Sequence, residues 1–71
     1  MTLKPGRYRH YKGKDYKVLF VATHSETEEP LVIYQTLYGK FDYWARPLEM
    51  FTGSVTIDGA EQPRFELVEP D

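Results

Sequence analysis

Three absences limit what this 71-residue sequence encodes. It has no cysteine, which excludes a disulfide framework and a thiolate metal site. No stretch approaches the roughly 20 apolar residues of a membrane span, and the N-terminus lacks an apolar run of signal-peptide length, so we expect a cytoplasmic protein without membrane contact. The five glycines are isolated from one another, which excludes a glycine-rich phosphate loop.

Nitrogen ligands for metals are equally scarce. The sequence offers only His10 and His24 beside its carboxylates, whereas a metal site needs three or four ligands. We therefore expect neither a metal nor a cofactor.

Aromatic residues are plentiful by contrast, with six tyrosines, four phenylalanines and one tryptophan. A chain this short buries only roughly 60% of the surface that its unfolded form exposes, so large rings must supply much of the core. The length allows one domain at most, and we expect residues 1–71 to form it.

Short alternating segments predict an all-β fold. Residues 16–23 and 31–38 are rich in β-branched and aromatic side chains, and the polar segment 24–30 between them ends in proline, which indicates an antiparallel hairpin. The first strand of that hairpin is apolar on both sides, which predicts a largely buried strand. Further strands are expected at 7–11, 43–46, 54–57 and 64–68, with one helical turn at 47–51. The last two strands are expected to be joined by the turn dipeptide Asp58-Gly59 and residues 60–63. About five to six short antiparallel strands favour a small SH3-like barrel or roll, with an OB-like barrel as the alternative.

The order of several short motifs also resembles a known family. These motifs are Gly6 to Gly13, Tyr16, His24 to Thr27, Tyr34, Leu37-Tyr38, Trp44 to Pro47, Met50-Phe51 and Pro63 to Phe65. Together they are similar to the small bacterial family known as domain of unknown function 1653, over about residues 5–67. The resemblance implies an SH3-like β roll and no established activity.

Basic residues are rare beyond Val21, where ten acidic residues accompany only three basic ones. Two of the three, Arg46 and Arg64, each lie beside a proline and within two residues of an aromatic ring. These neighbours restrict the backbone around a planar cation that suits bidentate pairing with a carboxylate or phosphate. Two interpretations follow: an anion pocket helped by His10, His24 or Lys12, or structural arginines that pair with acids such as Glu26, Glu49 or Glu66 and pack on Trp44 or Phe65.

The hairpin segment His24-Ser25-Glu26-Thr27-Glu28 is a second candidate. Its hydroxyls and carboxylates suit a turn held by side-chain to backbone hydrogen bonds, and the same groups suit a ligand. Because the serine, histidine and glutamate are consecutive, they do not match a catalytic triad, whose members converge from positions that the fold sets.

The N-terminal strand interleaves basic and aromatic residues, a pattern with which small β barrels bind single-stranded nucleic acid. The residues are Arg7, Arg9, Tyr11, Lys12 and Lys14. Against this stands the overall net charge of −2, since nucleic-acid binders are usually basic.

Taken together, the sequence favours a binding module over an enzyme. We expect it to recognise an anionic small molecule, peptide or protein partner, and to be a monomer or weak homodimer. The predicted ligand-binding residues are Arg46, Arg64, Trp44, Tyr34, Tyr38, His24, Glu26 and Thr27. Single-stranded nucleic-acid binding and a small hydrolase-like activity are the alternatives.

Overall fold

The computed structural model describes residues 3–71, which form seven strands and one short helix. In chain order the elements are β1 (Gly6–His10), β2 (Asp15–Thr23), β3 (Pro30–Thr36), β4 (Tyr43–Pro47), α1 (Leu48–Phe51), β5 (Ser54–Ile57), β6 (Ala60–Pro63) and β7 (Phe65–Pro70). Within this range no helix is long and apolar enough to cross a membrane.

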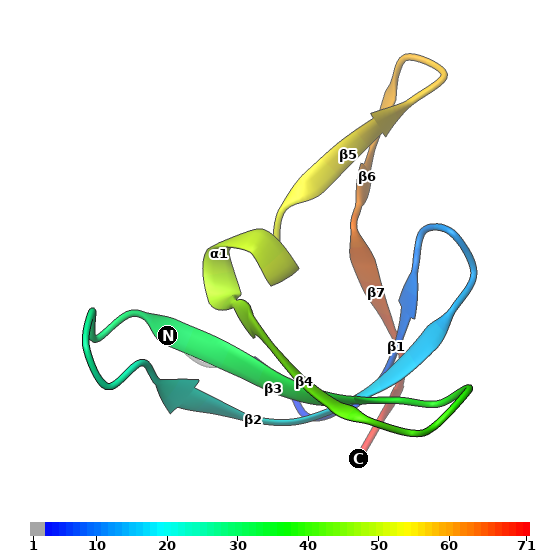
Figure 1. Ribbon diagram of the computed structural model, residues 1–71. Coiled ribbons are helices and arrows are strands. Elements are labelled where there is room, and N and C mark those ends of the chain that lie inside the picture. The colour runs from blue at the N-terminus through cyan, green and yellow to red at the C-terminus, as the bar shows by residue number, and fades with distance from the viewer. Residues whose placement is uncertain (1–2) are drawn as a thin grey trace.

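Five strands form one curved antiparallel sheet in the order β4-β3-β2-β1-β7, and β5 and β6 form a separate hairpin. Figure 1 shows this hairpin projecting away from the sheet, with α1 above the strands β3 and β4. The all-β class with antiparallel strands and one helical turn is confirmed.

Two features differ from the expected barrel. In residues 3–71 the edge strands β4 and β7 do not pair with each other, so the sheet does not close. Residues 60–63, expected to be part of a connection, form a strand that pairs with β5. Asp58 and Gly59 join the two strands with positive φ angles of 51° and 80°, which a tight hairpin turn requires.

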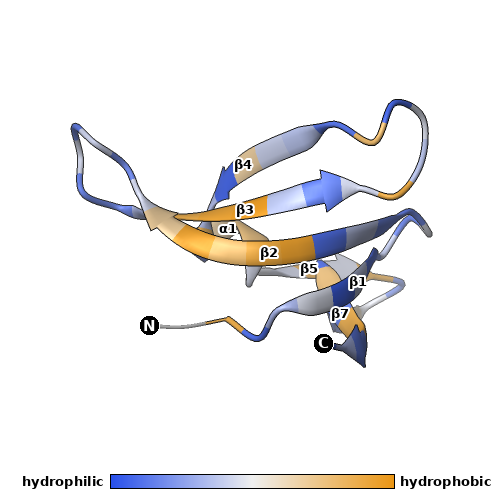
Figure 2. Ribbon diagram, turned by 90° about the horizontal axis from the view of Figure 1, so that it is seen from below, coloured by the Kyte–Doolittle hydropathy of each residue, from blue (hydrophilic) through white to orange (hydrophobic). Residues whose placement is uncertain are grey.

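The predicted hairpin of β2 and β3 is confirmed, but β2 is not buried along its length. A β-bulge at Leu19 shifts the register, because Val18 pairs with Tyr34 while Phe20 pairs with Ile33. The extra residue sends Val18 to the covered face and Phe20 to the opposite one, where Phe20 is 56% exposed. Figure 2 shows the apolar residues concentrated in the adjoining parts of β2 and β3.

The core lies on the concave face of the sheet, where α1 covers it. Its buried members are Tyr8, Tyr16, Val18, Val32, Tyr34, Leu48, Phe51 and Phe65. Phe51 of α1 stacks on Phe65 with ring centroids 4.0 Å apart and meets Tyr8 and Tyr34 edge-on. Such aromatic pairs each add about 0.5–1.5 kcal/mol beyond the area they bury, so this helical turn joins the strands that carry the candidate site.

Candidate functional site

Arg46 and Arg64 come from different elements, and both lie near His10, whose pKa their charges lower. Arg46 lies in β4 opposite Val32, and strand alternation therefore places its side chain on the concave face. Arg64 is the single residue between β6 and β7, and its backbone is held on both sides: its N–H donates to Gly53 O at 3.0 Å, and its carbonyl accepts from Tyr11 N at 3.0 Å.

Phe65 and Tyr34 hold the guanidinium of Arg46. Its Cζ lies 5.6 Å from the centroid of the Phe65 ring, and its Nε donates to the Tyr34 hydroxyl at 3.3 Å. The ring contact is a cation–π interaction, one of the structural interactions predicted for this arginine. Because Tyr34 is buried and fixed in the core, Arg46 has a defined direction.

In the described part of the chain, these arginines lack the acidic partners expected for a structural role. Among the residues that the structure describes, no carboxylate oxygen lies within 4.0 Å of the Arg46 or Arg64 guanidinium. The Nε of Arg64 is buried, and it has no hydrogen-bond partner within residues 3–71. Burying a polar group without a partner costs about 1–3 kcal/mol.

His10 completes a group of cationic and titratable side chains that we name the arginine cluster: His10, Arg46 and Arg64. His10 pairs with Phe65 across β1 and β7, and the two rings meet edge-on at 4.9 Å. Burial lowers the pKa of His10 below its ordinary value of 6.5. The positive charges of Arg46, Lys12 and Arg64 lower that pKa further. The lowered pKa favours the neutral imidazole, whose Nδ1 accepts from Lys12 N at 3.2 Å.

A pocket of about 390 Å³ opens beside His10. Its walls come from the β1–β2 turn and from the junction of β6 and β7, and its lining residues are Arg9, His10, Tyr11, Gly13, Gln62, Pro63 and Glu66. Pro63 and Tyr11 both adjoin Arg64, in sequence and by hydrogen bond respectively. The pocket thus reaches His10 of the cluster, and neither Arg46 nor Arg64 lines it.

The three aromatic residues expected to floor a groove differ in exposure. Trp44 is 42% exposed and lies 6.1 Å from the Tyr34 ring, whereas Tyr34 is buried and contributes only through its bond to Arg46. Tyr38 follows the end of β3, and its hydroxyl forms a 2.7 Å hydrogen bond with that of Tyr16. Burial, followed by this hydrogen bond, raises the pKa of Tyr16. Tyr16 was not among the predicted site residues, although strand alternation places it on the same face as Tyr34.

The predicted ligand-binding residues His24, Glu26 and Thr27 lie in the β2–β3 loop. Their hydrogen bonds are all made within that loop. His24 Nδ1 accepts from the backbone N–H groups of Glu26 and Thr27 at 3.1 and 3.2 Å. Thr27 Oγ1 accepts from Glu29 N at 3.3 Å. These contacts are those of a turn held by its own side chains, and none of them joins the arginine cluster.

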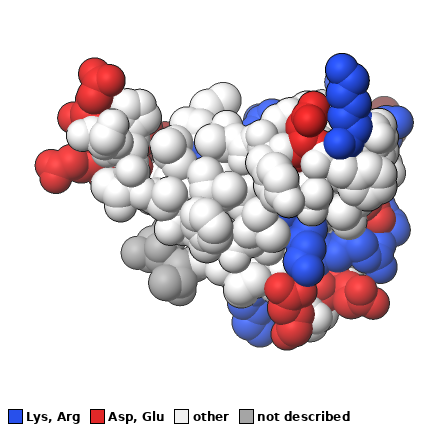
Figure 3. Space-filling model, turned by 60° about the horizontal axis from the view of Figure 1, so that its bottom comes forward, with Lys and Arg blue, Asp and Glu red and all other residues white. Residues whose placement is uncertain are grey.

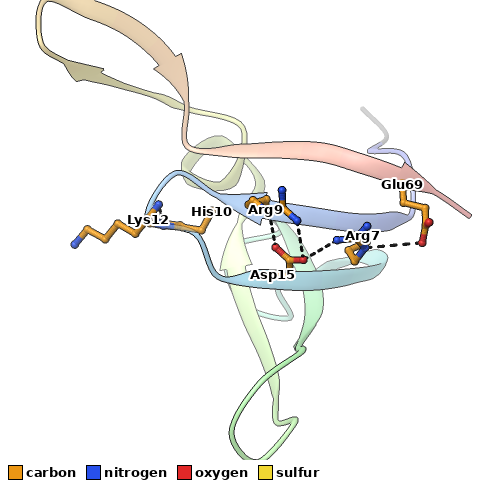
Figure 4. Close-up of polar contacts among 6 residues, drawn as sticks. All are labelled: Arg7, Arg9, His10, Lys12, Asp15 and Glu69. Carbon is orange, nitrogen blue, oxygen red and sulfur yellow. Dashed lines mark hydrogen bonds and ion pairs between the residues drawn. The ribbon is translucent and has the colours of Figure 1, made fainter.

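The basic N-terminal strand has its charges partly paired. Asp15 accepts from Arg7 at 2.6 Å and from Arg9 at 2.8 Å, and Glu69 lies 3.8 Å from Arg7 (Figure 4). The hydrogen bond from Arg9, reinforced by Arg7, lowers the pKa of the Asp15 carboxyl.

The other three residues of the predicted nucleic-acid surface are exposed: Tyr11, Lys12 and Lys14. Lys12 points away from the Asp15 network in Figure 4. Two of the four cations predicted for this surface, Arg7 and Arg9, therefore already form ion pairs with Asp15. Nucleic-acid binding at this strand stays a prediction.

Metal binding has no support in the described part of the chain. Residues 3–71 contain no group of three or more histidine, cysteine, aspartate or glutamate side chains placed to hold a metal ion.

Comparison with known proteins places the chain in a family. A family profile described as "Protein of unknown function (DUF1653)" matches residues 6–67. A crystal structure of a DUF1653 protein from Bordetella bronchiseptica is similar, with 38% sequence identity, a TM-score of 0.85, and coverage of 93% of this chain and 87% of that one. No match was found among curated proteins. The resemblance predicted from the motifs is confirmed, and the chain belongs to the DUF1653 family of proteins of unknown function.

Proposed function

We propose that the chain binds a ligand with a phosphate or carboxylate group at the arginine cluster. The observation that carries this proposal is the contrast between two pairs of arginines. Arg7 and Arg9 share Asp15, whereas Arg46 and Arg64 have no carboxylate within 4.0 Å in residues 3–71. Guanidinium groups pair well with planar anions, so an unpaired couple held beside an imidazole is suited to an anion from outside.

Electrostatics support the same proposal. Gathering positive charges raises the free energy of the unliganded protein, and a bound anion relieves that repulsion. It also offers an acceptor to Arg64 Nε, which is buried and finds none among the residues that the structure describes. The exposed ring of Trp44 adds an apolar surface near Arg46, so the favoured ligand joins an anionic group to a planar or apolar part.

Trp44 provides the assay, because it is the only tryptophan in the sequence. Selective excitation reports on its ring while phenyl phosphate or benzoate is titrated, with neutral benzyl alcohol as the matched ligand. We expect the two anions, and not the alcohol, to change the emission. Arg46→Met and Arg64→Met should each weaken binding at least about tenfold. Arg7→Met, which removes a paired arginine that does not line the pocket beside His10, is the control and should leave the affinity unchanged. A response to benzyl alcohol equal to that of the anions would contradict the proposal.

His10 adds a dependence on pH. A bound anion favours the protonated imidazole and raises the pKa of His10 from its lowered value, so affinity should increase as pH falls. An NMR titration of the His10 ring with and without saturating phenyl phosphate measures this shift directly. His10→Gln should remove the pH dependence near neutrality, and an unchanged pH profile in that variant would exclude His10 from the site.

A further inference from the structure

The strand β4 forms one edge of the five-stranded sheet. It pairs with β3 on one side, and within residues 3–71 no strand pairs with its other side. Figure 2 shows β4 at the rim of the sheet, with β3 beside it. Because an open edge leaves backbone N–H and C=O groups free to pair with another strand, β4 is a site for strand addition.

The hydrogen bonds between β3 and β4 show which backbone groups of β4 are free. Thr36 N donates to Asp42 O at 2.9 Å, so the backbone of Asp42 faces β3. In an antiparallel pair, residues that bond to the neighbouring strand alternate with residues whose N–H and C=O groups point away from it. The register of β3 and β4 continues without a bulge. The backbone groups of Tyr43 and Ala45 therefore point to the open edge.

The exposed side chains of β4 lack the charges that usually protect an edge strand. Tyr43, Trp44 and Ala45 are consecutive, exposed and uncharged, and Tyr43 is 66% exposed. The opposite edge strand, β7, contains Glu66 and Glu69. Figure 3 shows a largely uncharged surface in the middle of one side of the molecule, with charged side chains towards its ends. Strand addition is therefore favoured at β4 over β7.

The sequence at this edge is complementary to itself. Asp42, Trp44 and Arg46 alternate along the chain, so their side chains lie on the same, concave face. An acid, an aromatic ring and a base in this order match a second copy of the same segment that runs antiparallel. Among the described residues neither Asp42 nor Arg46 forms an ion pair, so both charges are free to meet another chain.

We propose that β4 pairs with β4 of a second copy of the chain, antiparallel and about a two-fold axis at Trp44. Tyr43 of each copy then exchanges backbone hydrogen bonds with Ala45 of the other, which uses the N–H and C=O groups at both positions. On the concave face the two Trp44 rings lie opposite each other, and Asp42 of each copy lies opposite Arg46 of the other. On the other face the small Ala45 side chain leaves room for the Tyr43 ring.

The pairing ends just beyond these residues. Pro47 has no N–H to donate, and Phe41, which would lie opposite it, has a positive φ of 54°. So short a contact gives weak, reversible dimers instead of an obligate dimer.

Sedimentation velocity at micromolar to millimolar protein concentrations tests the interface. It is done without a small anionic ligand, so that the outcome does not depend on the proposed function. Ala45→Pro removes an N–H that points to the open edge and is not bonded to β3. We expect this variant to fold and to raise the dimer dissociation constant at least about tenfold. Ala45→Ser, which keeps the N–H and a small side chain, is the matched control and should leave association unchanged.

Charge exchange makes the test specific to this register and remains informative if Ala45→Pro does not fold. Asp42→Arg and Arg46→Glu each place like charges opposite each other, so each variant alone should be monomeric. Their mixture should form heterodimers, because every arginine then faces an acid. Asp71→Arg makes the same change of charge at the exposed C-terminal residue and should not alter association. Circular dichroism of each variant shows that it is folded.

Three results would each overturn the proposal. They are a chain that stays monomeric up to millimolar concentration, a dimer insensitive to a folded Ala45→Pro variant, and a mixture of the folded charge variants that fails to associate.

Discussion

Replacing Arg64 by methionine distinguishes a binding residue from a structural one. Methionine keeps a long unbranched stem and removes the buried Nε, which has no hydrogen-bond partner in residues 3–71. A buried polar atom without a partner costs about 1–3 kcal/mol. We therefore expect Arg64→Met to leave the free energy of unfolding unchanged or to raise it by about 1 kcal/mol. An increase of about 1 kcal/mol corresponds to a Tm about 4–8 °C higher in a domain of this size.

Arg46→Met is the comparison, because Arg46 does have protein partners. It loses the 3.3 Å hydrogen bond to Tyr34 and the contact with the Phe65 ring. These two interactions are worth about 1–2 kcal/mol together, so Tm should fall.

Thermal and urea denaturation followed by circular dichroism measure both effects. If Arg64→Met destabilises the fold by the 3–5 kcal/mol typical of a broken buried ion pair, Arg64 is a structural clamp and the reasoning about its unpaired Nε is wrong. A stable Arg64→Met protein that no longer binds phenyl phosphate would assign Arg64 to ligand binding.

Four further changes test the fold and the cluster. Gly6→Ala should cost about 2–4 kcal/mol in denaturant unfolding, because Gly6 has a φ of 144° and a Cβ there would lie 2.5 Å from the Glu69 carbonyl oxygen. Phe51→Ala removes a ring that is 1% exposed and should cost about 3–5 kcal/mol, enough to abolish cooperative melting in so small a chain. Asp15→Asn should lower Tm at pH 7, because the lowered pKa means that this carboxylate stabilises the fold above pH 3.8. Its deficit relative to the unmodified protein should shrink as pH falls below 3.8 and vanish once the carboxyl is protonated in the folded state as well. His10→Glu places a carboxylate beside the two unpaired arginines, so Tm should rise while binding of phenyl phosphate is lost; a lower Tm with retained binding would contradict the electrostatic account.

The sequence predicted the elements whose signals are local. Alternation and the proline-terminated loop were sufficient for the hairpin of β2 and β3, and Asp58-Gly59 marked a turn correctly. The bulge at Leu19 was missed because a single inserted residue leaves the composition of the strand unchanged, yet it reverses the face of every residue after it. β6 was missed because its four residues are all exposed and show no apolar alternation.

The candidate site was predictable only in part, because only some of its features leave a local signal in the sequence. The residues flanking Arg46 and Arg64 in sequence showed that each is held by a restricted backbone, but not which side chains lie opposite. Their proximity to His10 depends on β1 pairing with β7, a contact between the two ends of the chain. Pairings of that sequence separation follow from packing of the whole chain and leave no local pattern.

Within residues 3–71, the lack of carboxylate partners for Arg46 and Arg64 does not reflect a shortage of acidic residues. Beyond Val21 acids outnumber bases ten to three, so pairing each arginine would require only one acid placed nearby. The same chain does so on the outer surface, where Asp15 serves Arg7 and Arg9 together. The neighbours of Arg46 are instead the Phe65 ring and the Tyr34 hydroxyl, and both arginines lie near His10, whose pKa they lower. Such surroundings orient a guanidinium without neutralising its charge. A guanidinium in that state binds an anion more strongly than one in an ion pair, because no internal ion pair has to be broken first.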